Sequence, residues 1–306
     1  MKDIKAMKDT FSGYHPVVNM FYFAVVIAFA MFFTHPACLI ISFVCAFTYS
    51  IYLNGKKALK FNLVYMLPML IVTVLLNPAF NHQGGTILTY LPGGNPLTLE
   101  SIVYGLVAAL MLITVISWFS CFNKVMTSDK FVYLFGRVIP ALSLILSMSL
   151  RLVPRFQAQI KIISNAQKCV GRDVSNGSLL RRMKHGIKIL SIMVTWALEN
   201  AIETADSMKS RGYGLPGRTA FSIYKFQRRD FYALVYIFVC GVYIFAGSLL
   251  DGLYFRYFPT IKGVLTETYT FTLIIAYFAL CIMPVIINVQ EDRKWAVLQS
   301  QSQSKI

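Results

Sequence analysis

The chain has 306 residues, of which 57% are hydrophobic and only 14% are charged. A soluble domain carries about 25% charged residues, so this composition argues against an ordinary soluble protein and favours a membrane protein. The chain holds 29 Lys and Arg against 13 Asp and Glu, a formal net charge of +16. Such an excess suits nucleic acid, an anionic lipid surface or an acidic protein partner, and the placement of the charges must decide among them.

Six apolar segments are long enough to cross the membrane as helices, which takes about 17 to 25 residues. They are Val17–Phe33, Pro36–Leu53, Phe61–Phe80, Leu99–Phe119, Phe231–Leu250 and Thr270–Val289. None alternates like a strand of a membrane barrel, and lipid cannot satisfy free backbone groups. The sequence therefore predicts an all-α polytopic membrane protein with about six spans. The first two segments are short and close together, so a tilted or re-entrant pair is an alternative.

The basic residues lie almost entirely on one side of this arrangement. With the N-terminus inside, the inside segments hold 27 Lys and Arg, and the outside segments hold only Arg256 and Lys262. Because cytoplasmic loops retain positive charge, both ends are expected inside. The apolar segment Phe131–Leu150, interrupted by Arg137 and Pro140, does not fit as a further span, since 15 Lys and Arg after it would then face outside. We expect it at the inner membrane interface or buried against other helices.

These segments divide the chain into three regions. Residues 1–120 hold the N-terminal membrane helices, residues 121–230 form a cytoplasmic helical region, and residues 231–306 hold the C-terminal membrane helices and a cytoplasmic tail. Between Phe122 and Asp230, 18 basic residues accompany 6 acidic ones. The apolar residues of this region nevertheless recur at helical spacing, so we expect ordered helices rather than a disordered tail.

Two long helices are expected in the middle region. A helical pattern follows Pro154 and stops at Gly171, and a second opens near Leu179 and stops at Gly212; glycine commonly follows a helix C-terminus. The second pattern includes a stripe formed by Ile187, Leu190, Val194, Ala197, Ala201, Ala205 and Met208. This helix is apolar nearly all round up to Leu198 and polar beyond it. Its first part is therefore expected to be buried against membrane helices or a partner, and its end to project into water.

The two helix ends have similar sequences. Residues 165–171 (NAQKCVG) align with residues 206–212 (DSMKSRG) at an offset of 41 residues, which places Lys168 over Lys209. At each end a cation precedes the glycine and lies at the negative end of the helix dipole, where it is free to enter an acidic groove. Each end is therefore a candidate grip for another protein. The alternative for such a cation is that it only complements the dipole or lipid phosphates.

At these residues the chain resembles the transmembrane T component of energy-coupling factor (ECF) transporters, which links paired ATPases to a substrate-binding membrane subunit. The resemblance is most specific from Ser149 to Thr219 and includes residues 150–155 (LRLVPR), 166–167 (AQ), 205–213 (ADSMKSRGY) and 218–219 (RT). In that family, two short Ala-Arg-Gly-like signatures lie at the tips of cytoplasmic coupling helices, and their arginines dock into grooves on the ATPases. The second signature is matched here by Ser210, Arg211 and Gly212.

The first signature departs from the family pattern, because it reads Cys169-Val170-Gly171 with Arg172 one place late. Either Arg172 or Lys168 replaces the missing arginine, or this tip docks mainly by packing. The resemblance thus implies that the ATPase-docking residues are Ala166, Lys168, Val170, Gly171, Arg172, Lys209, Ser210, Arg211 and Gly212. It also implies contact with the substrate-binding subunit through Ile187, Leu190, Val194 and Trp196, although an aromatic residue on an apolar helix is usually packed within its own protein.

The partners that this resemblance implies are two P-loop ATPase subunits, one substrate-binding S component and the lipid of a prokaryotic plasma membrane. Vitamins and transition-metal ions are the usual cargo of the family. The sequence lacks G-x-x-x-x-G-K-[ST], so we expect no cofactor on this chain and ATP hydrolysis by the partner subunits. No two histidines have metal-ligand spacing, so no metal site is expected.

Other functional classes fit the sequence less well. An ion-coupled transporter is expected to place ionisable residues within its spans, and these spans contain none beyond Glu100. An enzyme would need a nucleophile with a base, a metal set or paired carboxylates. Nucleic-acid binding would call for aromatic residues interleaved with the basic ones, and the membrane already accounts for the charge. The nearest alternative is a conventional permease that forms its own substrate pathway, but these spans offer few polar residues to line one.

Overall fold

The computed structural model describes residues 9–55, 60, 62–81, 84–90, 96–136, 139–216, 224–257, 260–263 and 267–303, with the side chains of residues 62–63, 140–143 and 302–303 left out. Arg137 and the matched pair Arg218 and Thr219 therefore lie outside the described residues. The chain forms two compact units. Unit 1 comprises Met1–Thr127 and Tyr224–Ile306, and unit 2 comprises Ser128–Ile223.

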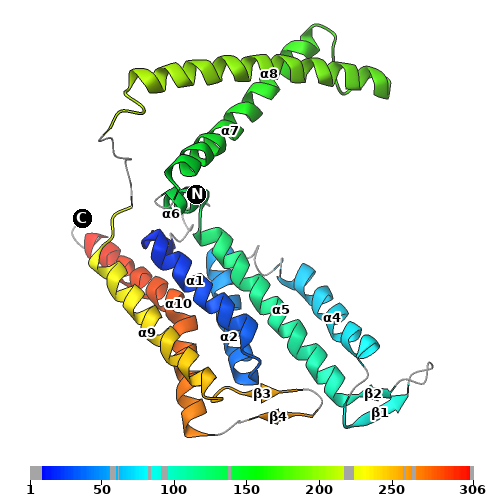
Figure 1. Ribbon diagram of the computed structural model, residues 1–306, viewed down its shortest axis with the longest axis vertical. Coiled ribbons are helices and arrows are strands. Elements are labelled where there is room, and N and C mark those ends of the chain that lie inside the picture. Colours follow the sequence, from blue (N-terminus) through cyan, green and yellow to red (C-terminus); the bar gives the residue numbers. More distant parts are fainter. Residues whose placement is uncertain are drawn as a thin grey trace. The chain divides into compact units, whose positions relative to one another are not determined.

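Unit 1 is built from long apolar helices that match the predicted segments (Figure 1). They are α1 (Pro16–Phe32), α2 (Pro36–Asn54), α4 (Leu67–Phe80, preceded by the π-helical turn η2, Asn62–Met66), α5 (Leu99–Val125), α9 (Arg228–Leu249) and α10 (Thr268–Gln303). Within the described residues, α2, α5, α9 and α10 are long and apolar enough to cross a membrane, and α1 and residues Val64–Phe80 are shorter apolar helices. The prediction of an all-α polytopic membrane protein is confirmed.

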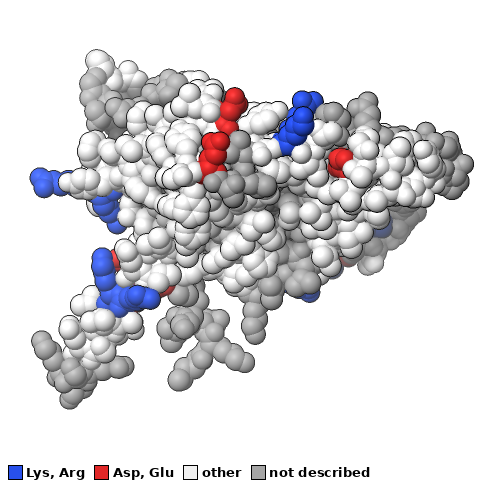
Figure 2. All heavy atoms as spheres, turned by 90° about the horizontal axis from the view of Figure 1, so that it is seen from below, with Lys and Arg blue, Asp and Glu red and all other residues white. Residues whose placement is uncertain are grey.

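Helix α5 lies between α4 on one side and α1 and α2 on the other (Figure 1). Its Trp118 is fully buried, and the indole Nε1 donates a hydrogen bond of 2.9 Å to Ser42 Oγ on α2. The rings of Tyr22 and Phe23 on α1 meet this indole edge-on at centroid distances of 6.2 and 6.3 Å. Between helices in lipid, close packing and interhelical hydrogen bonds hold the bundle together, because lipid tails are as apolar as the side chains. On the face seen from below in Figure 2, most described residues carry no charge.

Two short hairpins join helices of unit 1, and the sequence did not predict them. Strand β1 (Ile87–Tyr90) pairs antiparallel with β2 (Pro96–Thr98), with an irregularity between Ile87 and Thr89. Strand β3 (Phe255–Arg256) pairs with β4 (Lys262–Gly263). Strands of two to four residues leave too short a pattern to read from a Gly- and Pro-rich connection.

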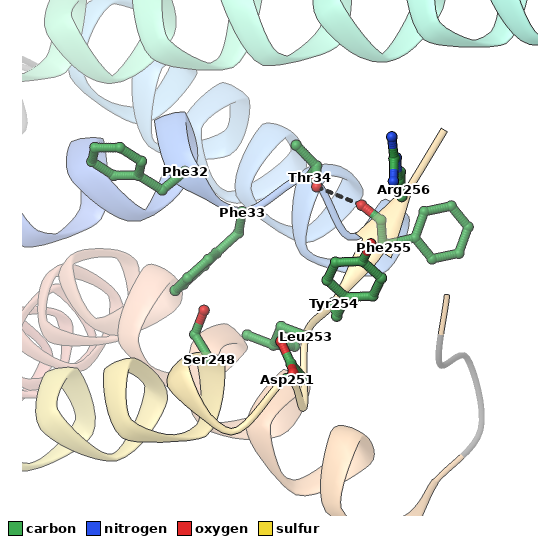
Figure 3. A pocket seen from close by; sticks show the side chains of 9 residues that line it. All are labelled: Phe32, Phe33, Thr34, Ser248, Asp251, Leu253, Tyr254, Phe255 and Arg256. Carbon is green, nitrogen blue, oxygen red and sulfur yellow. Dashed lines mark hydrogen bonds between the residues drawn. The ribbon is translucent and has the colours of Figure 1, made fainter. Parts of the chain in front are cut away.

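A pocket in unit 1 lies where the α1–α2 connection meets the segment that follows α9 (Figure 3). Thr34 Oγ1 donates a hydrogen bond of 2.9 Å to the carbonyl oxygen of Phe255. The Tyr257 hydroxyl donates one of 3.0 Å to the carbonyl oxygen of Thr34. These two hydrogen bonds connect the three-residue link between α1 and α2 to β3 and to the residue that follows it. They therefore join the two segments that line the pocket.

Unit 2 contains α6 (Ser128–Gly136), α7 (Pro140–Cys169) and α8 (Leu179–Ser210). The segment Phe131–Leu150 is divided between α6 and α7, neither of which is among the candidate spans found in the described residues. Helix α7 begins at Pro140 and runs through Pro154, whereas the sequence showed a helical pattern only after Pro154. A proline inside a helix removes one hydrogen bond. Helix α7 contacts both α6 and α8.

Candidate functional site

Helices α7 and α8 cross and pack through a small apolar cluster (Figure 1). Its buried members are Ile163 on α7 with Ile189 and Met193 on α8, and the half-buried residues around them are Phe156, Val174, Ile192 and Trp196. The rings of Phe156 and Trp196 meet edge-on with centroids 5.6 Å apart. The Arg155 guanidinium lies 5.5 Å from the Trp196 ring centroid, within reach of a cation–π contact. This cluster fixes the directions in which the two helices leave their crossing.

Both helices end in the same backbone arrangement. At the end of α7, which we call tip 1 (residues 166–172), the Gly171 N–H donates to the Lys168 carbonyl (3.0 Å) and the Arg172 N–H to the Gln167 carbonyl (2.9 Å). At the end of α8, tip 2 (residues 207–213), the Gly212 N–H donates to Lys209 (2.9 Å) and the Tyr213 N–H to Met208 (3.0 Å).

These two pairs of bonds are the Schellman motif, and both bonds of the motif in tip 1 have their counterparts 41 residues later in tip 2. Gly171 has a φ of +75° and Gly212 a φ of +77°. Glycine adopts this left-handed conformation without the penalty that a Cβ atom brings. The similarity of the two ends in sequence is thus also a similarity in backbone structure.

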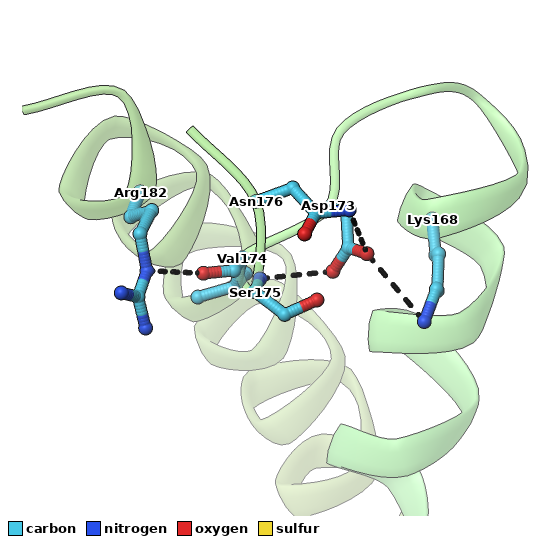
Figure 4. A network of polar contacts seen from close by, with 6 residues as sticks. All are labelled: Lys168, Asp173, Val174, Ser175, Asn176 and Arg182. Carbon is cyan, nitrogen blue, oxygen red and sulfur yellow. Dashed lines mark hydrogen bonds and ion pairs between the residues drawn. The ribbon is translucent and has the colours of Figure 1, made fainter. Parts of the chain in front are cut away.

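The loop after tip 1 is organised by Asp173 (Figure 4). Its carboxylate accepts a hydrogen bond of 2.9 Å from the Ser175 N–H and forms an ion pair of 3.4 Å with Lys168 Nζ. Arg182 Nε on α8 donates to the Val174 carbonyl at 2.7 Å and holds the loop against the next helix. The hydrogen bonds from Ser175, and then the Lys168 charge, hold the pKa of the Asp173 carboxyl below its ordinary value. Because Lys168 remains largely exposed, this ion pair is a weak one.

Most of the predicted docking residues lie at the surface of unit 2. Ala166, Lys168, Val170 and Gly171 are exposed in tip 1, where Arg172 is half-buried, and Lys209, Ser210 and Arg211 are exposed in tip 2, where Gly212 is half-buried. Val170 is 67% exposed although it is apolar. Tip 1 thus presents an apolar residue where tip 2 presents Arg211.

The predicted contacts for a substrate-binding subunit fall on two different faces of α8. Ile187, Leu190 and Val194 form an exposed apolar stripe, with 51 to 65% of each side chain accessible. Trp196 lies on another face, where it packs against Phe156 of α7. Its observed contact is therefore inside unit 2, as the packing alternative for this residue anticipated.

Sequence reasoning missed Asp173 as the partner of Lys168 in tip 1. A signal was present, because the stretch 173–177 (DVSNG) combines an Asp two residues before a Ser with an Asn-Gly pair, both of which favour tight turns. The pairing of Asp173 with Lys168 depends on how the loop folds back over the last helical turn. In the described part of the chain, no group of three or more His, Cys, Asp and Glu is arranged to hold a metal ion.

The fold and these two tips define the class: a helical membrane protein with a separate basic helical unit whose long helices end in matching glycine motifs. The family model described as "Cobalt transport protein" matches residues 9–221. The chain belongs to this family, and its resemblance to the T components of ECF transporters is confirmed.

Several relatives carry the name "Energy-coupling factor transporter transmembrane protein EcfT". The one from Lactococcus lactis subsp. cremoris is 37% identical over 108 residues, 35% of this chain and 41% of the relative. The one from Streptococcus equi subsp. equi is 27% identical over 218 residues, 68% of this chain and 78% of the relative. The one from Lactobacillus helveticus is 34% identical over 99 residues, 32% of this chain and 36% of the relative. The first and third alignments thus span less than half of those relatives.

Proposed function

We propose that this chain is the energy-coupling subunit of an ECF-type importer in the cell membrane of a prokaryote. In this proposal it transmits the movement of two P-loop ATPase subunits to a substrate-binding membrane subunit, and the cargo is a micronutrient such as a vitamin or a metal ion. The observation that carries the proposal is the pair of matching Schellman tips on crossed helices, 41 residues apart. Two tips with the same backbone arrangement suit a pair of motor subunits, either a homodimer or a heterodimer.

The proposal assigns the ATPase grips to tip 1 and tip 2. A helix C-terminus carries a partial negative charge, so a cation there is stabilised before any partner binds. On binding, it would meet an acidic groove of the ATPase. In tip 2, Arg211 is exposed and directly precedes Gly212. A charge-assisted hydrogen bond from its guanidinium to a groove carboxylate would contribute about 1.5–3 kcal/mol, which is too little to hold a complex alone. Exposed apolar groups such as Val170 would then supply part of the contact.

The proposal assigns the contact with the substrate-binding subunit to the exposed stripe of Ile187, Leu190 and Val194. Apolar residues exposed along one helix face are typical of a surface that another protein or lipid covers. The face of α8 that carries Met193 and Ile189 already packs on α7, so the stripe is available for a partner. A pull on either tip would move this stripe, because the α7–α8 cluster joins the two helices.

Reversal of the charge at tip 2 tests the proposal. We expect Arg211→Glu to leave the chain inserted in the membrane, to abolish substrate-stimulated uptake and to weaken co-purification of the ATPases, because the new carboxylate repels the acidic groove. The matched control is Arg181→Glu, the same charge change at an exposed position near the start of α8. Equal ATPase recovery with the two variants would overturn the assignment of tip 2. Arg211→Lys, which keeps the charge, is expected to retain most of the binding.

A further inference from the structure

The segment that precedes α1, residues 9–15, is held to α2 and α10 by polar contacts; we call it the N-terminal strap. Asn288 on α10 is fully buried, and its Oδ1 accepts hydrogen bonds from the Thr10 N–H (2.8 Å) and the Phe11 N–H (3.2 Å). Its Nδ2 donates to Asp9 Oδ1 at 2.6 Å. The Tyr49 hydroxyl on α2 donates to Asp9 Oδ2 at 3.2 Å. These three hydrogen bonds of Asn288 all join α10 to the strap.

The strap also contacts the chain where it leaves unit 1 for unit 2. Val125 is the last residue of α5, and unit 2 begins at Ser128. Ser12 Oγ lies 3.5 Å from the Val125 carbonyl oxygen, a long hydrogen bond. Phe11 and Val125 are fully buried members of the same apolar cluster. The exit from unit 1 is therefore packed against the strap.

The strap further contacts the chain where it returns from unit 2. Asp230, in the first turn of α9, accepts a hydrogen bond of 3.1 Å from the His15 N–H and is 1% exposed. Arg229 Nη2 donates to the Gly13 carbonyl at 3.0 Å, and its guanidinium lies 5.0 Å from the Tyr14 ring centroid. A buried carboxylate is costly unless it is hydrogen-bonded, and Asp230 meets that need partly through the strap.

We infer that the N-terminal strap is a positioning element that fixes both points from which unit 2 moves, with Asn288, Tyr49 and Asp230 as positioning residues. This inference rests on the proposed coupling function. A helical unit transmits a movement only if the points where it joins the membrane helices stay in place. The seven-residue strap contacts both of these points, the end of α5 and the start of α9. Without the strap, a pull on unit 2 would be absorbed by movement of the ends of α5 and α9.

The chain offers a matched pair of variants for this inference. Tyr49 and Tyr52 lie one turn apart on α2, and each donates a hydrogen bond from its hydroxyl to a carboxylate. Tyr49 donates its hydrogen bond to Asp9 of the strap, whereas Tyr52 donates its hydrogen bond to Asp292 on α10 at 2.6 Å and acts on Asp9 only electrostatically. Tyr→Phe removes only the hydroxyl and keeps the ring. Both variants therefore lose a hydrogen bond from a tyrosine hydroxyl to a carboxylate, and only Tyr49→Phe loses a hydrogen bond to the strap.

The test uses the chain assembled with its two ATPases. Nitroxide labels are placed at Gln290→Cys in unit 1 and Glu203→Cys in unit 2, both exposed positions, with Cys169→Ser to remove the exposed native cysteine. The distance between the two labels is measured by pulsed electron paramagnetic resonance, first without nucleotide and then with ATP and vanadate. The rate of ATP hydrolysis is measured on the same samples. For Tyr52→Phe and the parent we expect a nucleotide-dependent shift. For Tyr49→Phe and Asn288→Ala we expect loss of that shift with ATP hydrolysis retained.

A merely structural role of the strap predicts a different result, because lost stability would reduce the amount of intact complex without altering the shift in what remains. The same shift in Tyr49→Phe and Tyr52→Phe would therefore overturn the inference while the coupling function stands. If the parent chain recovers no ATPases, or shows no shift with ATP and vanadate, the proposed function fails and the strap inference falls with it. The two failures are distinguished by the parent measurement alone.

Discussion

At the scale of single residues, two glycines of unit 2 differ in backbone conformation: Gly171 follows the end of a helix, and Gly186 lies inside one. Gly171 ends α7 with a φ of +75°, and nothing lies within 4 Å of the place where its Cβ would be. Gly186 lies inside α8 with equally open surroundings but without a positive φ. Space is available at both positions, so the backbone conformation alone decides what a side chain would do.

We therefore expect Gly171→Ala and Gly186→Ala to change stability in opposite directions. At Gly171 the added Cβ opposes the left-handed conformation and costs about 1–2 kcal/mol. At Gly186 alanine favours the helix by about 0.5–1 kcal/mol. Hydrogen exchange of the amides in tip 1 and along α8, measured on the full chain, reports each effect locally. Slower exchange in tip 1 of Gly171→Ala would contradict the Schellman geometry described here.

The sequence located these residues well because their signals are local. A glycine after a helical pattern predicts a helix end, and the positions of Gly171 and Gly212 are confirmed by their backbone geometry. The ion pair of Lys168 with Asp173 was not foreseen, because the two residues meet only after the loop folds back. The roles of Arg172 and Arg211 in docking remain predictions, since they concern a partner.

At the scale of elements, α8 is a helix with separate faces. Met193 is 7% exposed and packs in the cluster with Ile163 of α7, whereas Leu190, one turn earlier, is 63% exposed. Both residues are apolar, so composition alone could not separate the face of α8 that packs on α7 from the face that is exposed. The crossing with α7 makes that distinction.

Truncation of these two side chains is expected to separate stability from partner binding. Met193→Ala leaves a cavity in the α7–α8 cluster and should destabilise unit 2 by about 2 kcal/mol or more. Leu190→Ala removes exposed apolar surface, so its effect on stability should stay within about 0.5 kcal/mol. Hydrogen exchange across α7 and α8 measures both. Under the proposed function, Leu190→Ala weakens recovery of the substrate-binding subunit, and equal destabilisation by the two variants would show that the stripe is covered within the chain itself.

Helix α7 shows why element boundaries were harder to predict than the elements themselves. Residues after Pro154 gave a helical pattern, and proline is a common helix boundary, yet α7 extends back to Pro140. Contacts of α7 with α6 and α8 depend on how the chain folds, and no local sequence pattern contains them. The hairpins β1–β2 and β3–β4 were missed for a related reason, since each pairs strands too short to leave a recognisable alternation.

At the scale of the whole molecule, the distribution of charge carries the prediction of orientation. Lipid forces the backbone of every span into helices, which is why the apolar segments predicted the helices of unit 1 so directly. The side of the membrane on which each loop lies is a separate question, and it depends on the charges of the loops. In the predicted arrangement, Arg256 and Lys262 are the basic residues outside, and all other Lys and Arg lie inside. This distribution predicts that unit 2 and both ends face the cytoplasm.

Cysteine labelling in intact cells tests this orientation. In a Cys169→Ser background, Thr260→Cys, between β3 and β4, and Glu203→Cys on α8 both place a thiol at an exposed position. A membrane-impermeant maleimide should label Thr260→Cys directly and Glu203→Cys only after the membrane is permeabilised. The physical reason is the cost of about 2.5–3.5 kcal/mol for each Lys or Arg placed at the membrane centre, which opposes translocation of the strongly basic stretch around α8. Labelling of Glu203→Cys in sealed cells would place unit 2 outside, beyond the reach of any ATP-driven partner, and would remove the basis of the coupling proposal.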